Sequence, residues 1–400
     1  MGPRPRSAHS GVFETDVAAP VVGASRRGGF KALLLVTELE DYTIAFANGL
    51  STHVSVVLAV PRRRYAHLAG WLDPSVDLRL LDWPRHRSFA NIPFLFSLTR
   101  LIRAERPDVV HLLSNTTLWL NAAAPFWRPA PLVTTVHDVT VHPGDRDTRV
   151  LPNWATNLIV RQSDAAIVHG PALQAAAARR FAKRNEDVHV VAHPAISRYT
   201  WRGGAAPAAG KTGRPFTVLF FGRVFAYKGL EDLVRAEALL AGRDLRVIVA
   251  GRGDDPFALR DRMGDATRYD IRNRFIPDGE VSDVFDEADV VALPYREASQ
   301  SGVLAIAAAF GKPAIVTDVG ELGGTIEASG AGLVVPPRNP AKLAEAIATL
   351  MDDPILRADL GTKARAWADG PISPAVVGAQ AARVYRNLVS GAGVMARSAP

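Results

Sequence analysis

The chain has 400 residues, 48% of them hydrophobic, with 47 lysines and arginines, 40 aspartates and glutamates, and no cysteine. This length predicts two domains, and the lack of cysteine excludes a disulfide framework and a thiolate metal site. No run approaches the roughly 18 apolar residues that span a bilayer, and residues 1–29 lack the apolar block of a signal peptide. We therefore expect a globular, cytoplasmic chain behind a disordered tail, residues 1–29.

The positive excess lies entirely in the first half of the chain. Residues 1–200 hold 23 basic and 16 acidic residues, a net charge of +7, whereas residues 201–400 hold 24 of each. Such a field attracts an anionic membrane surface or a phosphate-bearing acceptor. A solvated basic surface without any partner explains the charge equally well. No nucleic-acid-reading motif accompanies it, so we expect no nucleic-acid partner.

Both halves alternate short buried runs with helical patterns, which predicts two facing, doubly wound parallel sheets of the α/β class. In the first half the expected strands are 31–37, 54–60, 109–113, 132–136, 165–168 and 188–191, with helices over 92–104 and 171–183. In the second half they are 216–221, 245–250, 290–293, 314–316 and 332–335, with helices over 230–241, 255–263, 281–287, 301–310 and 340–351. The cleft between two such sheets is the expected active site.

A segment rich in Gly, Ala and Pro, residues 202–215, has no apolar periodicity and is the expected linker. It separates an N-terminal domain, residues 30–201, from a C-terminal domain, residues 216–375. A last helical pattern over 376–388 begins the terminal segment, residues 376–400.

The sequence FFGRVFAYKG at 220–229 follows an expected strand and opens a helical pattern. Backbone N–H groups at such a helix start bind phosphate, and here Arg223 and Lys228 lie five residues apart across the turn. A guanidinium fork with a mobile ammonium suits a diphosphate leaving group when no metal is present. The pattern therefore predicts transfer chemistry on a nucleotide-activated substrate.

Further motifs follow in order: VAGRG at 249–253, ADVVALPY at 288–295, EASQSGVLAIAAAFGKP at 297–313, DVGE at 318–321 and GAGLVVP at 330–336. With the first motif they resemble family 4 glycosyltransferases. The resemblance covers nearly all of residues 216–390 and extends loosely to VVH at 109–111 and TTVHD at 134–138. It implies a GT-B fold, a nucleoside-diphosphate-sugar donor, retention of the anomeric configuration, and no metal or other cofactor.

The resemblance also implies roles for individual residues. Arg223 and Lys228 match the diphosphate-binding pair, Glu297 matches the glutamate that contacts donor-sugar hydroxyls, and His137 matches a histidine near the reacting centre. The further donor-binding residues that it implies or leaves as candidates are Gly222, Phe275, Ile276, Gln300, Ser301, Gly302 and Val303. Each has an ordinary structural alternative, such as a surface cation, a serine N-cap, a loop carboxylate, a capping histidine or the end of a core strand.

The sequence departs from the family pattern inside one motif. The family has a second glutamate, eight positions after the first and about five before the glycine of GKP, that binds the ribose hydroxyls. Counting forward from Glu297 gives Ala305, counting back from Gly311 gives Ile306, and neither is acidic. We hypothesise that Gln300 compensates. The family's glycine-rich loop after the first strand is also missing, since TELEDY stands at 37–42.

Residues 83–106 mix aromatic and basic side chains. An amphipathic helix with Phe94, Leu95 and Phe96 could enter a membrane interface. The apolar positions 94, 98, 101 and 102 have the spacing of a core stripe, which favours burial of that face.

From these observations we expect a metal-independent, retaining hexosyltransferase. It moves a sugar from an NDP-sugar to a lipid-linked or polysaccharide acceptor in cell-surface or exopolysaccharide biosynthesis, at the inner face of the plasma membrane. By analogy with the family, the terminal helix packs back on the N-terminal domain. Two alternatives stay open: a nucleotide-sugar 2-epimerase on the same architecture, and a non-catalytic nucleotide-sugar-binding subunit. The sugar, the base, the acceptor and the linkage are not predicted.

Overall fold

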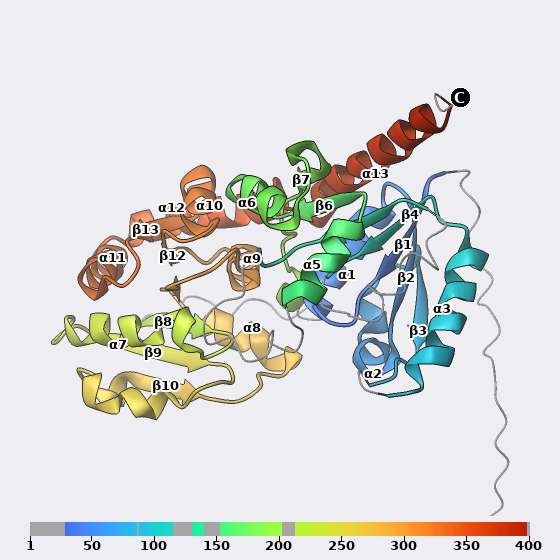
Figure 1. The fold of residues 1–400 in the computed structure, drawn as a ribbon. Helices are drawn as coiled ribbons and strands as arrows, with labels where there is room; N and C mark the ends of the chain where they lie inside the picture. The colour runs from blue at the N-terminus through green and yellow to red at the C-terminus, as the bar shows by residue number, and fades with distance from the viewer. Residues whose placement is uncertain (1–28, 86–87, 115–129, 140–152, 202–212, 398–400) are drawn as a thin grey trace, which may run out of the picture.

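The computed structural model describes residues 29–397 apart from 86–87, 115–129, 140–152 and 202–212. Nearly all of the predicted tail and most of the predicted linker lie outside these residues. Two parallel sheets, one in each half of the chain, are each covered by helices on both faces (Figure 1).

The N-terminal sheet has the strand order β3-β2-β1-β4-β5-β6-β7, with every pair parallel. Its strands are β1 (Lys31–Leu35), β2 (Ser55–Pro61), β3 (Val76–Leu81), β4 (Val109–Leu112), β5 (Leu132–Thr135), β6 (Ala165–Val168) and β7 (Val188–Val190). Its helices are α1 (Glu40–Ser51), α2 (Arg62–Tyr65), α3 (Asn91–Glu105), α5 (Asn153–Gln162) and α6 (Pro171–Phe181). Successive side chains of β1, such as Leu34 and Leu35, enter different core clusters on the two faces of the sheet.

The C-terminal sheet has the order β10-β9-β8-β11-β12-β13, again with parallel pairs. Its strands are β8 (Phe216–Phe221), β9 (Leu245–Ala250), β10 (Tyr269–Arg272), β11 (Val290–Leu293), β12 (Ala314–Thr317) and β13 (Gly332–Val335). Its helices are α7 (Leu230–Ala238), α8 (Asp278–Glu287), α9 (Gly302–Ala309), α10 (Leu322–Ser329), α11 (Pro340–Asp352) and α12 (Pro354–Asp369). The strand order reverses between β8 and β11, and ligands of such sheets bind at the carboxyl ends of the strands beside this point.

Several elements differ from the sequence prediction, among them two edge strands and one expected helix. The edge strands β3 and β10 carry charged residues such as Asp77 and Asp270, so neither reads as a buried apolar run. The prediction of a helix over 255–263 is wrong, because Pro256–Arg262 forms 3-10 turns. The side chain of Asp255 accepts a hydrogen bond from the N–H of Phe257, which favours a tight turn over a regular helix.

The last helix, α13 (Pro374–Arg397), leaves the C-terminal domain and packs on α1 of the N-terminal domain (Figure 1). The two helices approach closely, since a Cβ on Gly49 would lie 1.8 Å from the carbonyl oxygen of Pro374. Val377 and Tyr385 enter the core of the N-terminal domain. None of the described helices is long and apolar enough to cross a membrane.

Candidate active site

The turn after β8 carries Arg223 and Lys228 at the carboxyl edge of the C-terminal sheet. Gly222 has a φ of 102° and Gly229 a φ of 72°, conformations that favour glycine. A Cβ on Gly229 would also lie 1.8 Å from the carbonyl oxygen of Pro294, just after β11. The turn is therefore held against the end of the neighbouring strand, and this contact sets the position of Lys228.

The two cations of this turn lie beside aromatic rings. The Nζ of Lys228 lies 3.7 Å from the ring centroid of Tyr295, and the guanidinium carbon of Arg223 lies 5.8 Å from that of Phe225. The hydroxyl of Tyr295 forms a 3.2 Å hydrogen bond with Oγ of Ser301. Because a ring face orients an ammonium without neutralising it, Lys228 keeps its charge for an anion.

Helix α9 begins at the same edge of the sheet. Ser301, which precedes it, makes no side-chain capping bond, so its hydroxyl leaves the first N–H groups of α9, at Gly302 and Val303, without a cap. A Cβ on Gly302 would lie 3.8 Å from Nε2 of His193, a residue of the N-terminal half. The positive end of α9 therefore opens into the cleft between the domains.

The loop before α9 is anchored by Arg296. Its guanidinium makes two 2.8 Å hydrogen bonds to Asp232 of α7 and a 3.0 Å bond to Glu231, and these bonds raise the pKa of Arg296. The half-buried carboxylate of Glu297 has no hydrogen bond or ion pair with any residue that the structure describes. The buried Oε1 of Gln300 also lacks a hydrogen-bond partner within the described part of the chain. Both groups can accept hydrogen bonds from ligand hydroxyls.

The position of the missing second glutamate lies in the core. Ala305 and Ile306 are 3% and 5% exposed, and both belong to the cluster that packs α9 onto the sheet. Either count along the sequence therefore ends on a side chain that faces away from the cleft. A ribose contact in this protein must come from another residue.

His137 lies at the carboxyl edge of the N-terminal sheet, half-buried beside a second histidine, His169. Its Nε2 donates to the carbonyl oxygen of Leu113 at 2.8 Å, and its Nδ1 lies 3.2 Å from Nε2 of His169. The ring of Tyr42 packs edge-on against it, with centroids 4.7 Å apart. Burial lowers the pKa of His137 and, more strongly, that of His169. Burial likewise lowers the pKa of His193 to about 4.

The domains contact each other around this cleft. Glu321, in the loop after β12, accepts a 2.9 Å hydrogen bond from the N–H of Leu173 in the first turn of α6. Arg198 binds Asp41 at 2.5 Å and Asp278 at 2.7 Å, one from each domain. Within the described residues, no three His, Asp or Glu side chains are arranged to hold a metal ion.

Comparisons with known proteins identify the family. A model described as "Glycosyl transferase 4-like domain" matches residues 39–194, and one described as "Glycosyl transferases group 1" matches residues 215–353. A D-inositol 3-phosphate glycosyltransferase of Streptomyces bingchenggensis is 30% identical over 316 residues, which are 71% of this chain and 69% of that protein. The chain belongs to the family 4 glycosyltransferases.

Other members of the family match over different lengths. The alpha-D-kanosaminyltransferase of Streptomyces kanamyceticus is 28% identical over 277 residues, which are 64% of this chain and 71% of that protein. Other D-inositol 3-phosphate glycosyltransferases match this chain over only 37% to 44% of their length. The crystal structure of Anabaena HepE with UDP-glucose has a TM-score of 0.68 at 17% identity, covering 90% of this chain and 99% of that one. The predicted GT-B fold is confirmed.

This glycosyltransferase has His137 at the carboxyl edge of the N-terminal sheet, and Arg223, Lys228 and Ser301 at the carboxyl edge of the C-terminal sheet. Phe275 and Ile276 follow β10 at the same sheet edge, but the ring of Phe275 is 69% exposed and Ile276 packs in the core. A contact between this loop and a nucleobase would therefore have to be made by backbone groups. Sequence reasoning missed His169, although it follows β6 as His137 follows β5, and that repeated placement was the available signal.

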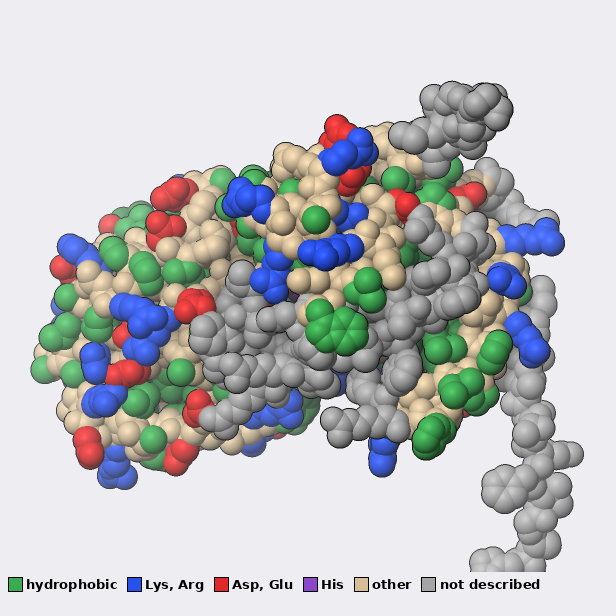
Figure 2. All heavy atoms as spheres, viewed as in Figure 1, with side chains coloured by type: hydrophobic (Ala, Val, Ile, Leu, Met, Phe, Trp, Pro, Cys, Tyr) green, Lys and Arg blue, Asp and Glu red, His purple; other side chains and the backbone are tan. Residues whose placement is uncertain are grey.

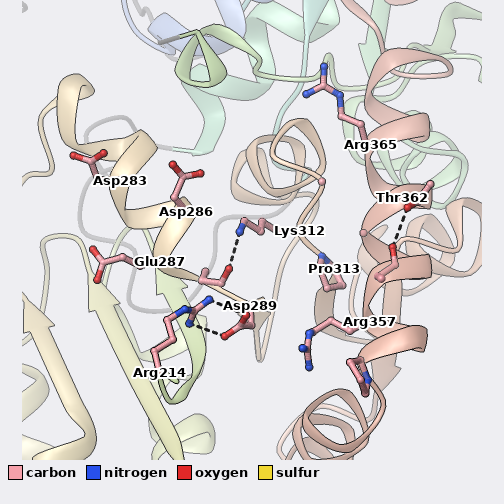
Figure 3. A pocket seen from close by; sticks show the side chains of 15 residues that line it. Arg214, Asp283, Asp286, Glu287, Asp289, Lys312, Pro313, Arg357, Thr362 and Arg365 are labelled. Carbon is pink, nitrogen blue, oxygen red and sulfur yellow. Dashed lines mark hydrogen bonds and ion pairs between the residues drawn. The ribbon is translucent and has the colours of Figure 1, made fainter. Parts of the chain in front are cut away.

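A cavity of about 740 Å³ lies at the wrong end of the C-terminal sheet for this chemistry (Figure 3). It is lined by Asp289 and Pro313, which stand before β11 and β12, so it opens at the amino edge of the sheet. Arg214 binds Asp289 through two 2.8 Å hydrogen bonds, and Lys312 donates to the carbonyl of Ala288 at 2.7 Å. These bonds tie the beginnings of neighbouring strands together, which is a structural role.

Proposed function

We propose that this glycosyltransferase takes its sugar from a nucleoside diphosphate sugar, without a metal and with retention of the anomeric configuration. The observation that supports the proposal is the run of contacts from Lys228 through Tyr295 to Ser301, because it links an ammonium with the residue that precedes helix α9. A departing nucleoside diphosphate gains negative charge in the transition state. Groups already oriented for that charge lower the barrier.

In this proposal each residue of the site has a role that follows from the chemistry of its side chain. Arg223 and Lys228 stabilise the leaving diphosphate, and the N–H groups that open α9 bind its remaining oxygens. Glu297 orients the sugar through its hydroxyls, and Gln300 accepts a ribose hydroxyl in place of the missing carboxylate. His137 lines the face on which the anomeric carbon reacts.

The experiment is a thermal-shift screen of nucleoside diphosphates and their sugars, followed by assays of donor hydrolysis and transfer. A bound donor raises the melting temperature by mass action. The double variant Arg223→Ala, Lys228→Ala should lose this shift and the turnover. The double variant Lys342→Ala, Lys363→Ala removes two exposed cations on the surfaces of α11 and α12 and should keep both. Unchanged turnover without Arg223 and Lys228 would refute the proposal.

The same experiment distinguishes the two alternatives. Donor that converts to its epimer without any acceptor indicates a 2-epimerase. Nucleotide binding with neither hydrolysis nor transfer, across a panel of donors and acceptors, indicates a non-catalytic binding subunit.

For the acceptor we propose a lipid-linked or polysaccharide glycan at the cytoplasmic face of a membrane. Helix α3 and the turn before it support this. Phe89 in the turn is 91% exposed, Ile92 and Phe96 of the helix are 59% and 68% exposed, and Arg100 and Arg103 are exposed further along the helix. Hydrophobic and basic side chains gather over this part of the N-terminal domain (Figure 2). The sequence expectation of a core stripe holds for other positions, since Leu98 and Ile102 of α3 are buried.

Vesicle sedimentation tests the membrane proposal. The chain should sediment with phosphatidylglycerol vesicles and not with phosphatidylcholine vesicles, and the variant Phe89→Ser, Phe96→Ser should stay in solution. Phe257→Ser is the matched control, because Phe257 is 55% exposed on the other domain. A second acceptor class, a small phosphorylated cyclitol, is favoured by what one relative is named for. Sugar transfer to such an acceptor in the absence of vesicles would favour this second acceptor class over the membrane-bound one.

A further inference from the structure

Two neighbouring histidines at the cleft make three contacts that together require more protons than two neutral rings carry. His137 and His169 follow adjacent strands, β5 and β6, with ring centroids 4.9 Å apart. The first ring faces the carbonyl oxygen of Leu113 at 2.8 Å, and the second faces that of Val191 at 3.0 Å. Between the rings, Nδ1 of His137 lies 3.2 Å from Nε2 of His169.

The count of protons follows from the acceptors. A carbonyl oxygen only accepts, so Nε2 of His137 and Nδ1 of His169 must both carry hydrogen. A neutral imidazole has one N–H, and each ring has now used it. The two nitrogens that face each other would then both present lone pairs at hydrogen-bond distance. A third proton between the rings satisfies all three contacts at once and gives the pair a single positive charge.

We propose that His169 is a positioning residue for His137, and that the pair takes up one proton when a nucleoside diphosphate binds in the cleft. The inference rests on the proposed function. The shared proton fixes the His137 ring between Leu113 and His169, and the resulting charge faces the cleft in which the anionic donor is held.

The surroundings explain why the proton arrives with the ligand. Burial, a charge on His137 itself, and the neighbouring His193 and His111 oppose a positive charge on His169, and they lower its pKa. Two carboxylates favour the charge: those of Glu38, from the loop after β1, and Asp138, from the loop after β5. Tyr42 of α1 contributes an uncharged ring edge, because burial raises the pKa of its hydroxyl. Across the cleft, Glu321 stands beside Gly170, next to His169.

A third imidazole connects this pair with the diphosphate side of the cleft. His193 lies 5.3 Å from His169, centroid to centroid, and a Cβ on Gly302 would lie 3.8 Å from its Nε2. Gly302 begins α9, whose N–H groups bind the diphosphate in the proposed function. An anion bound at the N-terminus of α9 would be separated from the histidine pair only by the side chain of His193. The negative charge of that anion would therefore offset the cost of protonating a buried ring.

The test is calorimetry of UDP, ADP and GDP binding at about pH 7.5, repeated in buffers with different ionisation enthalpies, which counts the protons taken up. For the wild type, binding of the nucleotide should be accompanied by the uptake of about one proton from the buffer. His169→Gln keeps an N–H group for Val191 but does not titrate, and should reduce the uptake to less than about half. His169→Phe removes both ring nitrogens and should reduce the proton uptake to the same extent. If this variant does not fold, the proton uptake of His169→Gln alone tests the inference. His189→Gln, on the next strand β7, is the control and should keep full uptake.

Kinetics separate positioning from simple stability. With the donor found in the screen, His169→Gln should lower kcat by about tenfold to a hundredfold with little change in KM, because a mispositioned ring acts on the chemical step. Nucleotide binding without proton uptake overturns this inference and leaves the proposed function intact. Uptake that persists in both His169 variants also overturns it. If no nucleoside diphosphate of the thermal-shift screen binds, the proposed function fails and this inference fails with it.

Discussion

Lys228 and Tyr295 form the contact that joins the turn after β8 to the start of α9. The ammonium lies 3.7 Å from the ring centroid, and the hydroxyl of the same tyrosine reaches Ser301 at 3.2 Å. The ring is 1% exposed and therefore rigidly packed. One buried side chain thus positions both groups that the proposed diphosphate site requires.

Replacing Tyr295 should separate these two functions. Tyr295→Phe keeps the ring under Lys228 and loses only the bond to Ser301, whereas Tyr295→Leu removes the ring. Since a cation–π contact is worth about 0.5–2 kcal/mol, we expect the leucine variant to bind a nucleoside diphosphate roughly 3 to 30 times more weakly. Titration calorimetry measures the affinities. Equal affinities for the two variants would show that the ring does not orient the ammonium.

A glutamate placed where the family has its second one should damage this protein instead of improving it. Ile306 is 5% exposed inside α9, so Ile306→Glu puts a carboxylate into the core without a partner. We expect a loss of about 3–5 kcal/mol in the free energy of unfolding, measured by urea denaturation, and no gain in nucleotide affinity. Ile306→Val is the control and should lose about 1 kcal/mol. A tighter nucleotide complex in the glutamate variant would mean that position 306 does reach the ribose.

How far the sequence predicts this structure depends on burial. Strands such as β8 and β11 are buried on both faces, so their apolar runs predict them within a residue or two. The edge strand β10 is half-buried and reads YDIR, with a charge at every second position, so no apolar run marks it. Helix α1 is not marked in the sequence because eight of its twelve residues are buried, so EDYTIAFANGLS shows no apolar stripe beside a polar face.

The candidate site divides in the same way. Arg223 and Lys228 stand in a local motif, so spacing alone predicts their common edge. The pairing of His137 with His169 depends on two strands being neighbours in the sheet, and the chain separates the two residues by 32 positions. Whether positions 305 and 306 face the cleft or the core depends on which face of α9 is buried. Counting residues along the sequence does not reveal this. Tertiary packing decides it.

The buried histidines should make the protein sensitive to acid. Burial lowers the pKa of His111 from 6.5 to about 3 and that of His193 from 6.5 to about 4, so the folded chain keeps these rings neutral where the unfolded chain protonates them. The unfolded state therefore binds more protons below pH 6.5, and the free energy of unfolding should fall as the pH drops from 6.5 toward 4. Each such proton contributes a slope of up to roughly 1.4 kcal/mol per pH unit.

Urea denaturation of the chain without nucleotide, at several pH values, measures that slope. His193→Gln should reduce this slope by an amount that corresponds to up to about one proton. This expectation does not depend on how the substitution changes the stability near neutral pH. His53→Gln, at an exposed position, should leave the slope unchanged. A wild-type stability that stays constant between pH 6.5 and 4 would show that the rings are not held neutral in the folded chain.

Arg198 should be the side chain on which the junction of the two domains depends most. It is 7% exposed and binds Asp41 of α1 and Asp278 of α8, so Arg198→Met leaves two carboxylates facing each other without a cation. We expect a loss of about 1–3 kcal/mol in the free energy of unfolding, because Asp41 and Asp278 are 31% and 40% exposed and water partly compensates the lost cation. Adding Asp41→Asn to this variant should recover part of the loss. Arg184→Met breaks an ion pair whose arginine is 67% exposed and should change little. Urea denaturation compares the three variants, and equal stability of Arg198→Met and Arg184→Met would show that water already solvates both aspartates.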